Sequence, residues 1–192
     1  MNRRQLLLAT AALALPSSAS AVTPSAAQAM VEDLVDDVNA VIASGASEAT
    51  MITRFGEILD AYADVPTIAR YCLGVDARRA TAGQMVQYTE AFQGYIASKY
   101  GRRFREFVGG EVSVVGAAPV KSWVEVETTV LLRGRSPLRM DWHVSDRSGR
   151  NAFFNFIIEG VNMLLTEREE VGAMIDKRRG SIDQLISDMK AV

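Results

Sequence analysis

The stretch of sequence that decides the fold is residues 123–132, which read WVEVETTVLL. Its apolar side chains recur at alternate positions, as at Val124 and Val130, while Glu125 and Glu127 take positions between them. Successive side chains of an extended strand point to opposite faces of a sheet, so this alternation predicts a strand with one buried and one solvated face. The fold therefore needs other elements to cover the apolar face of a sheet.

Three neighbouring segments continue the pattern. Residues 138–145 alternate in the same way, residues 152–158 are almost wholly apolar, and residues 111–117 precede the first strand. Gly134 and a stretch rich in Ser, Gly and Asn at 146–151 supply the turns between sequential strands. Strands joined in this way form an antiparallel meander with one apolar and one polar face. The sequence predicts a curved four-stranded antiparallel meander sheet.

The rest of the chain shows helical periodicity with clear start signals. Four predicted helices before the sheet begin at Thr23-Pro24, Ser47, Asp64 with Pro66, and Thr81 with Gln84. The fourth is the longest and is expected to continue to Phe107, before Gly109-Gly110 breaks it. After the sheet, capping boxes predict helix starts at Thr166 with Glu169 and at Ser181 with Gln184. The predicted fold is α+β, with several helices packed on the apolar face of the sheet.

The N-terminus reads as an export signal. Arg3 and Arg4 precede an apolar run at residues 6–15, and small residues at 19–21 fit a cleavage site. The run is shorter than the roughly 20 residues that span a bilayer. We expect residues 1–21 to be a cleaved signal peptide and residues 22–192 to form a single periplasmic domain. The paired arginines allow the twin-arginine route as well as the general secretory route, and no Cys follows the cleavage site to take a lipid anchor.

Composition and motifs exclude several classes of function. The formal net charge is −2, unlike the basic footprint of a nucleic-acid binder. Cys72 is the single Cys, so no internal disulfide forms, and we expect a small buried apolar side chain there. His143 is the single His and its alternation places it on the solvated face, against a Ser-His-Asp triad or a His-rich metal site. No catalytic residue, metal or cofactor is predicted.

An apolar surface is the main candidate site. The inner face of the sheet and the long helix carry Val, Phe, Met and Trp side chains. A closed core and a ligand pocket have the same periodicity, because packing alone distinguishes them. An acyl chain needs no specific polar partner, since each buried methylene contributes about 0.8 kcal/mol. The sequence therefore allows two interpretations of these apolar residues: a ligand pocket between the sheet and the helices, or an ordinary closed core.

Basic residues near the helix ends are a second candidate. Arg78 precedes the long helix, and Arg102 and Arg103 lie near its end. A guanidinium group suits a lipid phosphate or an acidic partner surface. A role in solubility, together with an interaction between these charges and the helix dipole, explains the same positions equally well.

Several segments together are similar to a known family. They are residues 64–74 (DVPTIARYCLG), 77–81 (ARRAT), Phe92 with 95–100, 154–162 (FNFIIEGVN), Arg168 and 180–186 (GSIDQLI). In this order and spacing, over roughly residues 50–190, the chain resembles the MlaC (toluene-tolerance) family. Departures from the family pattern at Ala77, Ala152, Asn155 and in residues 59–62 indicate a divergent member.

The resemblance implies a soluble periplasmic phospholipid carrier, an auxiliary component of an ABC-type lipid transport system that maintains outer-membrane lipid asymmetry. It implies a monomer that exchanges lipid between an outer-membrane lipoprotein complex and an inner-membrane ABC transporter complex, with acyl tails in a pocket and the headgroup near solvent. The predicted lipid-binding residues are Ile68, Leu73, Phe92, Ile96, Tyr100, Phe104, Val124, Val126, Val130, Met140, Trp142, Val144, Phe154, Phe156, Ile158 and Val161. The predicted headgroup or partner contacts are Arg78, Arg102 and Arg103.

Three alternatives stay open. A divergent branch would carry a hopanoid-like lipid in place of phospholipid. An NTF2-like small-molecule enzyme would need a carboxylate buried among apolar residues, for which Glu159 is the best candidate. A non-catalytic interaction scaffold would have a closed core and act through its surface.

Overall fold

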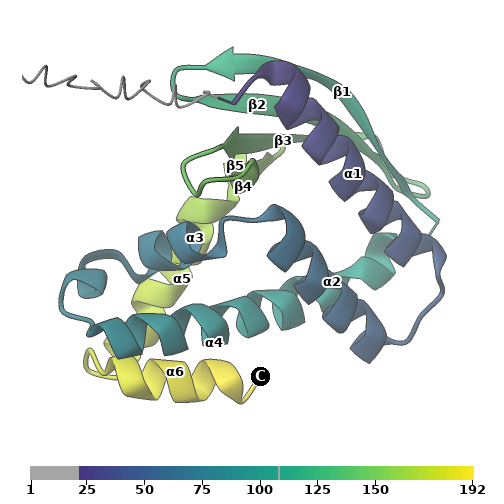
Figure 1. Cartoon of the computed structure of the whole chain (residues 1–192). Helices are drawn as coiled ribbons and strands as arrows, with labels where there is room; N and C mark the ends of the chain where they lie inside the picture. Colours follow the sequence, from purple (N-terminus) through teal and green to yellow (C-terminus); the bar gives the residue numbers. More distant parts are fainter. Residues whose placement is uncertain (1–21, 108) are drawn as a thin grey trace, which may run out of the picture.

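The computed structural model, which describes residues 22–107 and 109–192, has a five-stranded antiparallel sheet along one side (Figure 1). Its strands follow chain order: β1 (Glu111–Val120), β2 (Trp123–Leu131), β3 (Leu138–Ser145), β4 (Ala152–Ile158) and β5 (Val161–Asn162). The predicted α+β class and the antiparallel sheet are confirmed, but the predicted number of four strands was wrong. The fifth arises because Glu159 and Gly160 both take positive φ, which turns the chain back and pairs Val161 with Ile158.

The pairing of β2 with β3 follows the predicted alternation. Val126 lies opposite Trp142 and Glu127 opposite Asp141, so apolar residues share one face and acids the other. The pairing of β3 with β4 does not, because a register shift falls between His143 and Val144. The shift pairs Val144 with Phe153, so that Phe153 takes the inward place that simple alternation gives to Phe154.

The displaced Phe154 packs on the outer face of the sheet. Its ring lies 5.8 Å from the His143 ring and 6.1 Å from the Trp123 ring, centroid to centroid. These rings cover His143, which is only 9% exposed, and Nε2 of His143 lies 3.3 Å from Oε2 of Glu125. The predictions of a solvent-exposed His143 and an inward Phe154 were therefore wrong. Both errors follow from the register shift and the aromatic cover, which alternation does not reveal.

Six α-helices and two short 3-10 helices complete the described residues. They are α1 (Pro24–Ala43), α2 (Glu48–Tyr62), α3 (Val65–Leu73), η1 (Gly74–Arg78), α4 (Ala82–Gly101), η2 (Arg102–Phe107), α5 (Met163–Lys177) and α6 (Ile182–Lys190). The predicted N-caps are confirmed at Thr23, Ser47, Asp64, Thr81 and Ser181, whose side chains accept hydrogen bonds from the first turn. Thr81 and Gln84 form the predicted capping box.

Two helix boundaries differ from the prediction. The long helix ends at Gly101 and continues as the tighter η2, because glycine is a poor helix former and 3-10 turns are common at helix ends. Gly101 also lies against α2, where an added Cβ would come within 2.7 Å of Ile52 Cα. At α5, Asn162 caps the helix by accepting from the Leu165 N–H, so the helix starts before Thr166. The Thr166 hydroxyl donates to the Asn162 carbonyl and caps nothing.

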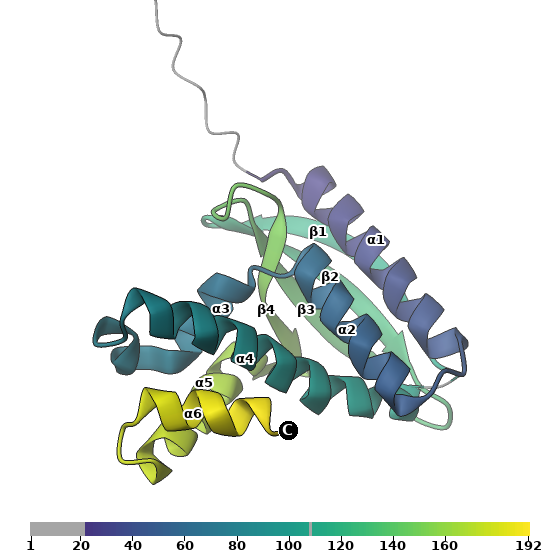
Figure 2. The same ribbon diagram turned by 60° about the horizontal axis from the view of Figure 1, so that its bottom comes forward.

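The helices surround the inner face of the sheet. α1 packs on β1 and β2, α2 packs on α1 and α4, and α6 lies beside α4 on the side away from the sheet (Figures 1 and 2). α3 and α5 pack on each other and on β4. No helix among residues 22–107 and 109–192 is long and apolar enough to cross a membrane. The predicted signal peptide at residues 1–21 lies outside the described residues.

Candidate functional site

A cavity of about 460 Å³ lies between the inner face of the sheet and the helices. Ligand pockets in proteins typically measure about 300–1,000 Å³. The lining comes from α1, α2, α4, η2 and all five strands, together with Glu159 in the β4–β5 turn and Met163 at the start of α5. The residues are Leu34, Val35, Val38, Ile42, Phe55, Ile58, Leu59, Ile96, Tyr100, Arg103, Phe107, Val112, Val130, Met140, Trp142, Phe153, Phe156, Ile158, Glu159, Val161 and Met163.

The sheet contributes an aromatic floor. The Trp142 ring lies 5.1 Å from the Phe153 ring and 5.4 Å from the Phe156 ring. The indole Nε1–H donates to Thr128 Oγ1 at 3.1 Å, and the Thr128 hydroxyl donates to the Met140 carbonyl at 3.0 Å. Because its one polar atom is satisfied within the sheet, Trp142 adds an apolar surface to the cavity.

The helices contribute an aliphatic wall. Leu34, Val38 and Ile42 recur at i+4 spacing on one face of α1, which therefore faces the cavity along two turns. Asn39 fastens this helix to the sheet: its Nδ2 donates to the Val112 carbonyl at 2.9 Å, and the Val112 N–H donates to its Oδ1 at 3.0 Å. Wall and floor are thus joined by a polar tie next to the apolar lining.

Charged residues line the cavity only where it meets solvent. Arg103 and Glu159 are exposed, and Val161, which also lines the cavity, is 54% exposed. Glu159 accepts a hydrogen bond from the Arg139 N–H. The expectation that Glu159 is a buried carboxylate was wrong, because the β4–β5 turn places it at the surface.

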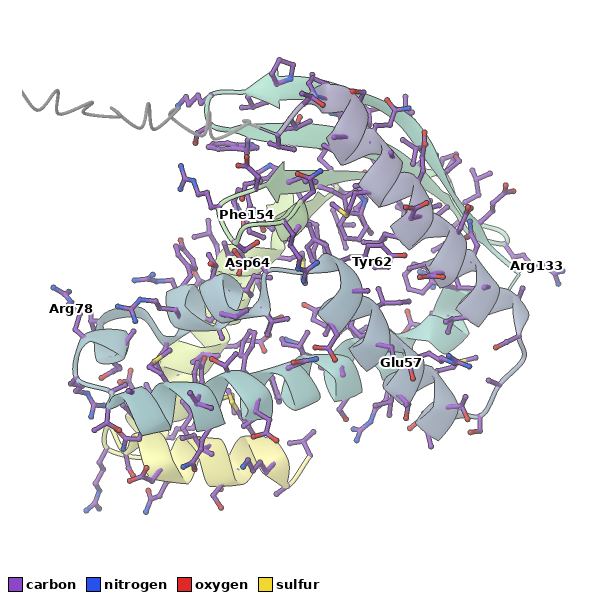
Figure 3. The ribbon with its side chains drawn as sticks, in the orientation of Figure 1. Glu57, Tyr62, Asp64, Arg78, Arg133 and Phe154 are labelled. Carbon is purple, nitrogen blue, oxygen red and sulfur yellow. The ribbon has the colours of Figure 1, made fainter. Side chains whose placement is uncertain are left out.

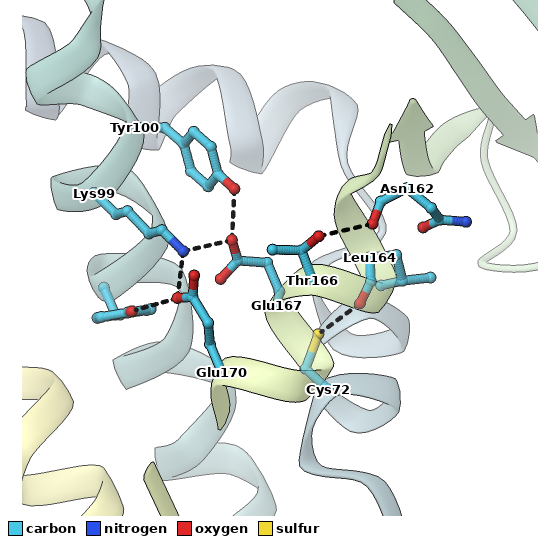
Figure 4. A network of polar contacts seen from close by, with 9 residues as sticks. Cys72, Lys99, Tyr100, Asn162, Leu164, Thr166, Glu167 and Glu170 are labelled. Carbon is cyan, nitrogen blue, oxygen red and sulfur yellow. Dashed lines mark hydrogen bonds and ion pairs between the residues drawn. The ribbon is translucent and has the colours of Figure 1, made fainter. Parts of the chain in front are cut away.

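A buried carboxylate close to the cavity is Glu167, which sequence analysis missed. Glu167 is 5% exposed, and its Oε1 accepts from Lys99 Nζ at 2.7 Å and from the Tyr100 hydroxyl at 2.5 Å (Figure 4). Lys99 also pairs with Glu170. The signal was present in the sequence: Glu167 stands at i+4 spacing before the buried Val171 and Ile175, on the apolar stripe of α5.

The environment holds the neighbouring groups in single protonation states. Burial, together with the hydrogen bond and the charge of Glu167, raises the pKa of the Tyr100 hydroxyl. Burial acts to lower the pKa of Lys99, but the hydrogen bonds to Glu167 and Glu170 outweigh it and the net pKa is raised. Burial raises the pKa of the Cys72 thiol to about 12. Tyr100 therefore remains a donor, Lys99 a cation and Cys72 a neutral thiol, as its predicted burial suggests.

The structure brings together half of the predicted lipid-binding residues. Those that line the cavity are Ile96, Tyr100, Val130, Met140, Trp142, Phe156, Ile158 and Val161. A smaller recess of about 50 Å³ beside it is lined by Ile68, Phe92 and Phe154, among others. Leu73, Val124, Val126 and Val144 are buried in the core outside both linings, where helices pack closely and leave no space. The side chain of Phe104 lies outside the described part of the chain.

The three predicted basic contacts do not form one cluster. Arg103 lines the cavity, and the adjacent Arg102 pairs loosely with Glu48, at 3.8 Å from Nε to Oε1. Arg78 lies in η1 beyond the opposite end of α4, about 30 Å of helix away (Figure 3). Among the described residues, no group of three or more His, Cys, Asp or Glu side chains is placed to hold a metal ion.

The fold and the cavity define the class of protein: an α+β domain whose antiparallel sheet and helices enclose an apolar space. The sequence model of the MlaC protein family matches residues 28–191, and the chain therefore belongs to the MlaC family. The fold is similar to that of a phospholipid-binding protein from Ralstonia solanacearum, solved in complex with a phospholipid. The two chains share 21% sequence identity with a TM-score of 0.69, over 86% of this chain and 95% of the other.

Proposed function

We propose that this protein is a periplasmic phospholipid carrier that moves lipid between the outer- and inner-membrane complexes of an ABC-type lipid transport system. The observation that carries the proposal is the apolar cavity of about 460 Å³ between sheet and helices. Membership of the MlaC family and the phospholipid bound to a protein of similar fold support the same function. Acyl tails occupy the aromatic floor and aliphatic wall, and the headgroup lies near Arg103.

The alternatives receive less support. A closed scaffold has no use for a cavity of this size within its core, whereas a carrier requires one. An enzyme of the kind considered above needs a buried acid or base that is free to exchange a proton. Glu167, the buried carboxylate near the cavity, is instead held by Lys99 and Tyr100. A hopanoid-like ligand would fill the same apolar space, so the identity of the extracted lipid decides between the two cargoes.

A pair of matched tryptophan variants tests the role of the cavity. Val38 and Ala40 lie on opposite faces of α1: Val38 lines the cavity, while Ala40 lines a separate hollow between α1 and α2. Val38→Trp should fill part of the cavity and lower the fraction of lipid-loaded protein severalfold, because less volume is left for the ligand. Ala40→Trp should leave loading unchanged.

The measurement is native mass spectrometry of protein purified without detergent, with lipid analysis of its organic extract. Circular dichroism confirms that both variants fold. A phospholipid adduct in the wild type and in Ala40→Trp, reduced in Val38→Trp, supports the carrier. A bare wild-type protein that also takes no lipid from vesicles would contradict the proposal.

A further inference from the structure

A chain of two hydrogen bonds joins the single histidine to the start of α5. The Leu164 N–H donates to Asn155 Oδ1 at 3.1 Å, and Asn155 Nδ2 lies 3.3 Å from His143 Nδ1. Asn155 on β4 is paired with His143 on β3, and both side chains are buried. A titratable group is therefore connected, away from bulk solvent, to the first turn of a helix.

The Leu164 N–H belongs to a part of the chain that borders the mouth of the cavity. Leu164 is the second residue of α5, where a backbone N–H has no acceptor within the helix (Figure 4). The cap residue Asn162 serves the N–H that follows, whereas the N–H of Leu164 depends on Asn155 in β4. The adjacent Met163 lines the cavity, and so does the exposed Val161. Asn155 thus fastens the edge of the mouth to the sheet.

The neutral form of His143 fits this arrangement. Because Asn155 Oδ1 accepts from the Leu164 N–H, the group that Asn155 turns towards the ring is its NH2, which can only donate. Nδ1 is therefore the accepting nitrogen of the imidazole. The ring proton then lies on Nε2, which is 3.3 Å from Oε2 of Glu125.

The surroundings of His143 contain one contacting carboxylate. From β2 come Glu125 and the Trp123 ring, at 5.5 Å between centroids, and from β4 comes the Phe154 ring at 5.8 Å. On β3 itself, Asp141 stands two residues away and is paired with an arginine of the same strand. In the part of the chain that the structure describes, no further ionisable side chain is joined to the ring by a hydrogen bond or ion pair. Glu125 can balance the charge when the ring takes up a second proton.

Protonation of His143 is incompatible with both hydrogen bonds at once. An imidazolium donates from both nitrogens, so its Nδ1–H would face the NH2 group of Asn155. If the amide turns round to offer its oxygen, its NH2 group faces the Leu164 N–H and that hydrogen bond is lost. A hydrogen bond from a charged donor is the stronger of the two, so the turned amide is favoured.

We propose that His143 is a proton sensor: acid pH releases the first turn of α5 from β4 and speeds lipid exchange at the mouth of the cavity. The release of α5 follows from the hydrogen bonds alone. The effect on exchange rests on the proposed lipid-carrier function.

Hydrogen exchange of the Leu164 amide, followed by NMR at pH 7.5 and pH 5.5, tests the sensor. Few histidines are protonated at the higher pH and most are at the lower. Division by the rates of an unstructured peptide at the same pH gives a protection factor. We expect the Leu164 protection factor to fall about fivefold on acidification, which corresponds to the loss of one hydrogen bond. The Val112 amide, held by the side chain of Asn39, should keep its protection.

Two variants remove the response in different ways. His143→Gln removes the titrating group, so the Leu164 protection factor should be equal at both pH values. Asn155→Asp supplies one oxygen for the Leu164 N–H and another for the Nδ1–H, so acidification should no longer release the amide. Circular dichroism confirms that both variants fold. Equal protection of Leu164 at both pH values in the wild type would overturn the proposal, as would an undiminished fall in His143→Gln.

Lipid transfer tests the link between the sensor and the mouth of the cavity. The protein is loaded with a fluorescent phospholipid and mixed with phosphatidylcholine vesicles, which keep their charge between the two pH values. Transfer should be severalfold faster at pH 5.5 in the wild type and independent of pH in His143→Gln. A fall in Leu164 protection with no change in transfer would refute the link. If the wild type takes up no phospholipid at either pH, the carrier function fails, and Leu164 exchange still decides on the sensor.

Discussion

At the scale of single residues, the site depends on polar groups that are satisfied just behind an apolar surface. Thr128 is fully buried in the middle of β2 and links Trp142 to the Met140 carbonyl. Its hydroxyl is thus both donor and acceptor within the sheet. The indole face of Trp142 can line a cavity for an apolar ligand only because its N–H is satisfied elsewhere.

Replacing Thr128 by Val tests this dependence. The substitution keeps the shape of the side chain but leaves the indole N–H of Trp142 buried without an acceptor, which should cost about 1–3 kcal/mol of unfolding free energy. Thr129→Val, on the outer face of the same strand, should change it by less than about 0.5 kcal/mol. Urea unfolding followed by tryptophan fluorescence measures both, and equal effects would show that the hydrogen bond contributes little.

A second residue-scale prediction concerns alkaline pH. The thiol of Cys72 has an ordinary pKa of 9.0 in the unfolded chain and about 12 when buried. The folded state therefore retains a proton that the unfolded chain releases, and stability is complete below pH 9 and falls as the pH rises towards 12. Between pH 8 and pH 10 this one group should cost about 1 kcal/mol.

The alkaline prediction is checked by urea unfolding at pH 8, 9 and 10. Cys72→Ala is less stable at every pH because it leaves a small void, but its loss between pH 8 and 10 should be about 1 kcal/mol smaller than that of the wild type. Parallel pH profiles for the two proteins would contradict the assigned role of the thiol.

At the scale of elements, local signals in the sequence were sufficient for most helices. Caps at Thr23, Ser47, Asp64, Thr81 and Ser181 depend on hydrogen bonds between a side chain and the next turn, so the sequence reveals them directly. The β3–β4 register shift and the packing around His143 depend on residues distant in the chain. Periodicity carries no information about such contacts, which explains the errors at Phe154 and His143.

The tie between α1 and β1 gives an element-scale prediction. Asn39→Ala removes both hydrogen bonds to the Val112 backbone, and should lower the unfolding free energy by about 1–3 kcal/mol and speed hydrogen exchange of the Val112 amide at least tenfold. Gln28→Ala is the control, because the Gln28 side chain donates to Glu32 on the same helix, at an exposed position away from the sheet. Unchanged Val112 exchange in Asn39→Ala would show that α1 is held by its apolar face alone.

At the scale of the whole molecule, the sequence predicted the class of fold and eight of the residues that line the cavity, but not the space itself. Val126 and Met140 have the same character and face the same way, yet Met140 lines the cavity and Val126 is fully enclosed in the core. The difference arises from how closely the helices approach the sheet at each point, and that distance is a property of the assembled fold. Glu167 is a similar case, because its partners Lys99 and Tyr100 come from a different helix.

The contact of Gly101 with α2 helps to determine the width of the cavity, because it fixes how closely α2 and α4 approach each other. Both α2 and α4 supply walls of the cavity. The backbone of Gly101 in α4 packs directly against Ile52 in α2, so closely that an added Cβ would lie 2.7 Å from Ile52 Cα. The girth of cargo that the molecule accepts is therefore governed in part by a residue that touches no cargo. Substitutions of lining residues change the local shape and depth of the cavity, whereas its width depends on the distance between α2 and α4 at this crossing.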